Sequence, residues 1–185
     1  MKKEKKKMKK LAILLAVLGG TAGAQQPPAD PDPGLKTLTQ VCIVCRDVDA
    51  CSKRWADALG VAPPVIRTTK PGPEVKELYR GKPSTGQARI ANIRLGQVTL
   101  ELLQPVGPDT SWKDVLDQKG ESVHHIAFSV QDVDKTVKRF ESLGMPVWHQ
   151  GRFDGDNGTY TYVDSPRSLG VIVELLHTEG PPKKQ

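Results

Sequence analysis

The chain repeats itself, and this internal repeat restricts the fold more than any other feature of the sequence. QVCIVCRDVDACSKRW (residues 40–55) aligns with HIAFSVQDVDKTVKRF (residues 125–140) at a constant offset of 85 residues. Both segments open with a strand-like apolar stretch and continue through Asp-Val-Asp into an amphipathic helix. Asp47 and Asp132 are the predicted N-caps, because an Asp side chain can accept the free amide hydrogens of a first helical turn.

The two copies also end alike. VTLELL (residues 98–103) and VIVELL (residues 171–176) are apolar strands interrupted by one Glu at the same place. Each copy has room for two further strands, predicted near Pro64–Arg67, Arg89–Leu95, Val147–Arg152 and Thr159–Asp164. The alternative, an accidental likeness of two strand–helix units, does not explain the matching ends. The sequence therefore predicts two tandem βαβββ modules, residues 38–106 and 122–177.

One long loop, Thr68–Gln87, interrupts the first module. It is rich in Pro, Gly and Lys. Loops of this length that lack secondary structure are often functional. We expect it to be mobile and to cover a site.

The positive charge of the chain is confined to its start. The pI is about 9.2, but seven of the 27 basic residues and one of the 21 acidic residues lie in residues 1–10. The rest of the chain therefore carries equal numbers of the two signs. The basic pI gives no reason to expect nucleic-acid binding.

The lysine-rich start has the order of a secretory signal peptide. The apolar run Leu11–Leu18 follows it, and Ala22-Gly23-Ala24 supplies a cleavage site. The run is too short for a stable membrane anchor. We expect a signal peptide (1–24), a Pro-rich linker (25–36), one folded domain (37–178), a polar tail (179–185), and export to the periplasm or the medium. The alternative is a disordered basic tail on a cytosolic protein.

The three cysteines, Cys42, Cys45 and Cys51, allow at most one internal disulfide. Cys42 and Cys45 form a C-x-x-C pattern, but they lie in a predicted strand, where positions three apart face opposite sides. A Cys45–Cys51 bridge stays open. Buried free thiols are the default expectation.

Four polar residues occupy equivalent positions in otherwise apolar strands: Gln40, Glu101, His125 and Glu174. Taken singly, each could be structural. Burial of an isolated carboxylate is very costly, however, so two of them in pseudo-symmetric places indicate a shared positive partner. Three oxygen donors with one imidazole suit Zn²⁺, Ni²⁺, Co²⁺ or Mn²⁺. We therefore predict that these four residues bind a divalent metal ion.

Four motifs make the sequence resemble the vicinal oxygen chelate (glyoxalase/bleomycin resistance/dioxygenase) superfamily. They are QVCIV (40–44), LELLQP (100–105), HHIAF (124–128) and VEL (173–175). The resemblance covers Leu38–His177 and implies an α+β fold whose curved mixed sheets enclose a metal-binding cavity. It also places the family's metal positions on the four residues above. Among its branches, the sequence looks closest to methylmalonyl-CoA epimerase and glyoxalase I.

That resemblance implies an enzyme that removes a proton next to a carbonyl group, as an epimerase, isomerase or lyase. Glu174 is the first candidate base and Glu101 the second. An acid that the epimerases have before the third strand is missing, and Ser84 and Thr85 stand near that place. The expected partner is a small molecule, and a homodimer is left open. Coenzyme A and glutathione substrates are cytosolic, so an exported member is expected to use another substrate.

Two other functions compete with this interpretation. A ring-cleaving dioxygenase normally uses two His and one carboxylate, and Gln40 replaces one His. A non-catalytic protein that binds an antibiotic or another small ligand is the stronger rival, and metal content would separate it from the enzyme.

Core or surface roles are expected for four further residues that could contact a ligand: Trp148, His149, Tyr160 and His177.

Overall fold

A computed structural model of the chain describes residue 35 and residues 37–180. The predicted signal peptide, nearly all of the predicted linker and the last five residues of the predicted tail lie outside the described residues. Within the described part, no helix is long and apolar enough to cross a membrane.

The first module runs through five elements in the predicted βαβββ order. These are β1 (Leu38–Val44), α1 (Val48–Leu59), β2 (Ile66–Thr68), β5 (Gln87–Leu95) and β6 (Val98–Val106). The side chain of Asp47 accepts hydrogen bonds from the amides of Asp49 and Ala50, as expected for an N-cap. Helix α1 ends at Gly60, whose positive φ of 66° is the left-handed conformation that favours glycine.

The second module repeats this order. It consists of β7 (Ser122–Ser129), α3 (Val133–Ser142), β8 (Val147–Arg152), β9 (Gly158–Val163) and β10 (Ile172–Thr178), with a short helix α4 (Pro166–Leu169) before the last strand. Asp132 caps α3 by accepting from the amide of Lys135. Helix α2 (Ser111–Lys119), which the sequence analysis did not predict, joins the modules. The predicted α+β fold of two βαβββ modules is confirmed.

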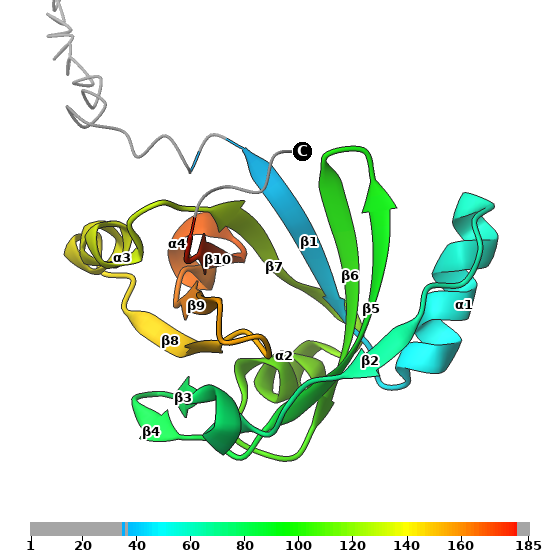
Figure 1. The fold of residues 1–185 in the computed structure, drawn as a ribbon, viewed down its shortest axis with the longest axis horizontal. Coiled ribbons are helices and arrows are strands. Elements are labelled where there is room, and N and C mark those ends of the chain that lie inside the picture. Colours follow the sequence, from blue (N-terminus) through cyan, green and yellow to red (C-terminus); the bar gives the residue numbers. More distant parts are fainter. Residues whose placement is uncertain (1–34, 36, 181–185) are drawn as a thin grey trace, which may run out of the picture. The chain divides into compact units, whose positions relative to one another are not determined.

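The strands of both modules form one strongly curled ten-stranded sheet (Figure 1). Its order is β2-β5-β6-β1-β7-β10-β9-β8-β3-β4. At the centre, β1 runs parallel to β6 and antiparallel to β7, and β10 runs parallel to β7. Side chains alternate across these strands: Leu100 and Leu102 pack against α1, whereas Leu103 belongs to the core cluster that contains α2. The central strands therefore present one set of side chains to an outer helix and the other to the inside of the curl.

The long loop of the first module has more secondary structure than we expected, and its residues Thr69, Val75 and Glu77 line a cavity, in line with its predicted place over a site. It contains a 3₁₀ helix (Gly72–Val75) and the short strands β3 (Leu78–Tyr79) and β4 (Lys82–Pro83). Strand β3 pairs antiparallel with β8 of the second module, so backbone hydrogen bonds hold the segment at the sheet edge. A Cβ atom at Gly72 would lie 2.4 Å from the carbonyl oxygen of Ser84, so the glycine permits a close internal packing. This pairing is non-local, which is why the local sequence pattern did not predict it.

The default expectation of three free thiols is wrong for two of them. Cys45 and Cys51 form a disulfide, and Cys42 is free and buried. Cys45 follows β1 and Cys51 lies in the first turns of α1, which brings their Cα atoms to 6.2 Å. That separation is within the usual range for a disulfide, roughly 4.4–6.8 Å.

Candidate metal centre

The centre of the sheet brings the four predicted metal-binding residues together. Gln40 lies on β1, Glu101 on β6, His125 on β7 and Glu174 on β10, which are four neighbouring strands. The equivalent positions of the two modules meet here because β1 and β7, the first strands of the modules, pair with each other. A single polar residue in each apolar strand thus becomes part of one polar cluster.

His125 is the hub of this cluster. Its Nε2 atom lies 3.0 Å from Oε2 of Glu174, 3.8 Å from Oε2 of Glu101 and 3.2 Å from Nε2 of Gln40. A half-turn of the Gln40 amide would place its oxygen where the nitrogen now lies, so the residue can offer an oxygen donor. The structure therefore places all four side chains around one imidazole nitrogen.

The cluster is buried and holds two acidic groups for one basic group. His125 is fully buried, and Glu174 and Glu101 are 3% and 7% exposed. Burial and the neighbouring Glu174 raise the pKa of Glu101, against the opposing effect of His125. Burial disfavours the charged form of His125, but Glu174 and Glu101 outweigh it and hold the His125 pKa above its usual value. One imidazole cannot neutralise two carboxylates.

The polar atoms of the cluster are also incompletely satisfied. Oε2 of Glu174 is buried, and within the described part of the chain its polar contact is with Nε2 of His125 at 3.0 Å, which leaves its remaining acceptor capacity unused. Buried polar atoms normally have a hydrogen-bond partner or a bound ion. Two carboxylates, one imidazole and one amide form a donor set that suits a borderline divalent cation. The residues therefore fit the divalent metal that the sequence analysis predicted.

The cluster opens onto a cavity of about 560 Å³. Gln40, Glu101 and Glu174 line it, whereas His125 lies behind them in the protein interior. Its aromatic walls are Trp112, Phe153, Tyr160 and Tyr162, and its charged walls are Arg67, Glu77, Arg152 and Asp154. Cavities of this size hold small organic ligands.

A second buried carboxylate, Glu77, was not singled out from the sequence. It is 3% exposed and lines the cavity. The Tyr160 hydroxyl donates to its Oε2 at 2.7 Å, and Nε2 of His149 lies 3.4 Å from its Oε1. Burial raises the pKa of Glu77, but His149, Ser84 and Tyr160 together hold it below the usual value. Glu77 precedes a two-residue strand in an irregular segment, so no periodic pattern marked it.

The other residues named from the sequence have ordinary roles, with one exception. His149 is fully buried, Trp148 packs partly buried against the core, and Nδ1 of His177 contacts the Val130 carbonyl oxygen. Tyr160, by contrast, lines the cavity. Ser84, near the place of the missing epimerase acid, is buried and donates to the Asp109 carbonyl oxygen, so its hydroxyl is already engaged.

Comparisons with known proteins agree with this fold. A segment of a Bacillus subtilis protein described as uncharacterized, YqjC, is 30% identical over 95 residues, which are 51% of this chain and 68% of that protein. The methylmalonyl-CoA epimerase of Mycobacterium tuberculosis superposes with a TM-score of 0.54 at 18% identity, over 78% of this chain and 88% of that one. A Streptomyces coelicolor methylmalonyl-CoA epimerase variant with bound 2-nitronate-propionyl-CoA gives 0.55 at 24%, over 77% and 97%.

The structural likenesses, all below 25% identity, show the fold alone. The family evidence is the match of residues 39–163 to the model of the glyoxalase/bleomycin resistance protein/dioxygenase superfamily. This segment spans more than half of the chain. It contains nearly all of β1 and the whole of β6 and β7, and it ends before β10, which carries Glu174. The chain belongs to the glyoxalase/bleomycin resistance protein/dioxygenase superfamily.

Proposed function

We propose that the chain is a metal-dependent enzyme that removes a proton from the carbon next to a carbonyl group, as an epimerase, an isomerase or a glyoxalase-like lyase. One observation supports this most directly. A buried cluster of two carboxylates, one imidazole and one amide lies at the floor of a cavity large enough for a small substrate. Such a cluster in a structural role would be expected to balance its own charge.

Gln40, Glu101, His125 and Glu174 would hold the ion, for which Zn²⁺, Ni²⁺, Co²⁺ and Mn²⁺ are the candidates. When bound, a divalent cation polarises a carbonyl oxygen and makes the neighbouring C–H bond more acidic. Because His125 is fully buried behind the cavity, it is placed to hold the ion rather than to contact substrate.

Glu174 is the proposed base. Its side chain lines the cavity, and its Oε2 lies 3.0 Å from Nε2 of His125, so this oxygen could accept a proton once the imidazole nitrogen holds an ion instead. Glu101 also lines the cavity and is the second candidate. Return of the proton to the opposite face of the carbon gives epimerisation, and return to the neighbouring carbon gives isomerisation.

The test is exchange of a substrate α-proton for solvent deuterium, measured with methylmalonyl-CoA and with smaller carbonyl compounds that carry a second oxygen donor. Glu174→Gln keeps an oxygen donor but loses the proton acceptor. We expect metal-dependent exchange in the wild type and a fall of about 10²–10⁴-fold in the variant. Glu121→Gln, at a partly exposed carboxylate that pairs with Arg54, is the matched control. Exchange at the wild-type rate by metal-loaded Glu174→Gln would contradict the assignment and move the base to Glu101.

The second candidate is a binding protein of the same fold. The aromatic cavity walls favour it, because Trp112, Tyr160 and Tyr162 could pack against a flat ligand without any chemistry. The two functions differ in one measurement. The enzyme exchanges a proton of its ligand in a metal-dependent way, whereas a pure binder does not.

We also propose export of the protein, for which the sequence of residues 1–24 gives the reason. The Cys45–Cys51 disulfide agrees with an oxidising compartment, where such bridges persist. Coenzyme A thioesters are cytosolic, so under this proposal the substrate is a different small carbonyl compound. Mass spectrometry of the mature protein should find an N-terminus near Gln25, and a full-length cytosolic chain as the main species would contradict export.

A further inference from the structure

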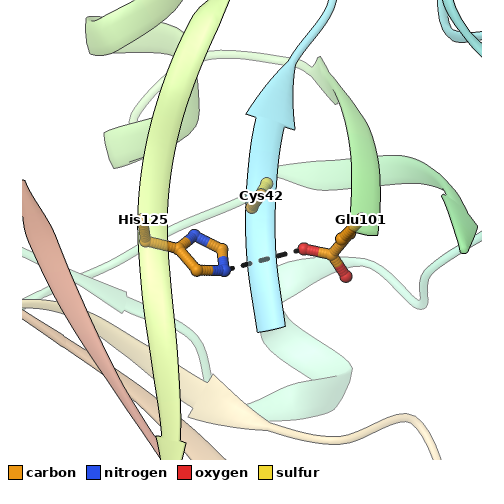
Figure 2. A group of neighbouring side chains, drawn as sticks. All are labelled: Cys42, Glu101 and His125. Carbon is orange, nitrogen blue, oxygen red and sulfur yellow. Dashed lines mark ion pairs between the residues drawn. The ribbon is translucent and has the colours of Figure 1, made fainter. Parts of the chain in front are cut away.

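A free cysteine lies inside the candidate metal centre. Cys42 is the residue on β1 that is opposite Glu101 on β6 and opposite His125 on β7. All three are buried, and their ligand atoms lie within 4.8 Å of one another. Figure 2 shows the Cys42 side chain on the central strand, between the His125 ring and the Glu101 carboxylate.

Cys42 lies among side chains with donor atoms, which distinguishes it from a small residue that only fills the core. Gln40 and Cys42 are two residues apart on one strand, so both side chains point to the same face. On that face Oε2 of Glu174 also lies 3.0 Å from Nε2 of His125. Five side chains with donor atoms thus surround one place, whereas a closed structural zinc site needs four. At least one of them must therefore be spare when a tetrahedral ion is bound.

We propose that Cys42 is a metal ligand, which completes a Cys42–Glu101–His125 set and leaves Glu174 free to act as the base. This inference rests on the metal centre of the proposed function and refines it. The three ligand atoms lie within 4.8 Å of one another, and Oε2 of Glu174 lies beside them, 3.0 Å from Nε2 of His125. Ligand atoms around a tetrahedral zinc ion lie roughly 3.3–3.8 Å apart, given bond lengths of about 2.0–2.3 Å, so small side-chain rotations close the set.

The chemistry of sulfur predicts which ions the centre prefers. On binding, the Cys42 thiol releases its proton to solvent and the sulfur bonds the ion as a thiolate. A thiolate favours Zn²⁺, Co²⁺ and Cd²⁺ over the oxygen-preferring Mn²⁺. With Cys42 as a ligand, Glu174 does not have to serve as both a metal ligand and the base. It can take a proton without first leaving the ion.

The experiment is titration of the purified, metal-free protein with Co²⁺, followed by absorption spectroscopy. A sulfur–cobalt bond gives a charge-transfer band in the near ultraviolet, which oxygen and nitrogen ligands do not give. The sequence has three cysteines, and Cys45 and Cys51 are bridged, so a band from disulfide-intact protein can come only from Cys42. We expect the band at one Co²⁺ per chain, its loss in Cys42→Ser, and its retention in Glu174→Gln.

A lower metal affinity of Cys42→Ser would not by itself show that Cys42 is a ligand. Loss of a residue that only orients a ligand can also cost about 10–100-fold in metal affinity. The wild-type spectrum decides without any variant: His125-dependent Co²⁺ binding with no charge-transfer band overturns the role of Cys42 and leaves the proposed function standing. Absence of any Co²⁺, Zn²⁺ or Mn²⁺ binding overturns both. A charge-transfer band that survives in folded Cys42→Ser also overturns the proposal. Competition of Zn²⁺ with Mn²⁺ gives a second measure, since Cys42→Ser should lower the preference for Zn²⁺.

Discussion

Two buried clusters of carboxylate and imidazole line the interior of the curled sheet, and they differ in charge balance. In the first, His149 faces one carboxylate, Glu77, which also accepts the Tyr160 hydroxyl. In the second, His125 faces two carboxylates, Glu101 and Glu174. Both imidazoles are fully buried. The first cluster has one acid for one base, whereas the second has one acid more, which must keep a proton or meet a further cation.

The hydrogen bonds of the two imidazoles sharpen this difference. Nδ1 of His149 lies 3.0 Å from the Ser111 hydroxyl, and the ring packs edge-on against Trp112, so its place is fixed by structural neighbours. Nδ1 of His125 lies 2.8 Å from Nδ1 of His124, a second imidazole whose pKa burial and His125 lower well below the usual value. A neutral His124 can donate a hydrogen bond to Nδ1 of His125 or accept one from it. This bond orients Nε2 of His125 toward the carboxylates. Burial of a carboxylate–imidazole pair alone therefore does not identify a functional site; the second carboxylate at His125 does.

The largest expected effect comes from breaking the balanced pair. His149→Ala leaves the Glu77 carboxylate buried without its imidazole partner, and loss of one partner of a buried pair costs about 3–5 kcal/mol of stability. Urea denaturation of the metal-free wild type and variant measures this loss of stability. The control is His177→Ala, which removes one contact to a backbone carbonyl and should cost about 0.5–1.5 kcal/mol. An equal, small loss in both variants would show that the Glu77–His149 pair is unimportant for stability.

The pH dependence of stability should have opposite signs in the two clusters. The Glu77 pKa is lowered, so its contribution is present above about pH 4.3 and is lost as the pH falls. The Glu101 pKa is raised, so metal-free native protein keeps this proton after the unfolded chain has released it, and stability falls as the pH rises above about 4.3. The raised pKa of His125 acts in the same direction at higher pH.

Glu101→Gln should therefore flatten the loss of stability with rising pH in metal-free protein. The change in the free energy of unfolding should be smaller than that caused by His149→Ala. In Glu101→Gln no carboxylate is left without a partner, because Glu101 and Glu174 can share one proton in the wild type. Thermal unfolding across a pH series with a chelator present measures it. A steeper fall in the variant than in the wild type would mean that Glu101 is stabilised as a carboxylate.

The sequence predicted the parts of this molecule that repeat. The matched strands, the Asp caps and the Glu in each final strand identified the two modules and four residues of the centre, because alternation and spacing are local properties. Cys42 was not identified as a ligand, because a cysteine in an apolar strand has the pattern of a core residue. Glu77 and the pairing of β3 with β8 were missed because both depend on contacts between segments about 70 residues or more apart.

Metal content per chain tests the central claim most directly. The protein should be purified, loaded with Zn²⁺, desalted and analysed by mass spectrometry of the elements, together with His125→Ala and His149→Gln. We predict about one ion per chain in the wild type and in His149→Gln, whose amide can still donate to Glu77, and loss of most of the ion in His125→Ala, because His125 is the imidazole at the hub of the unbalanced cluster. Unchanged metal content in folded His125→Ala would contradict the account.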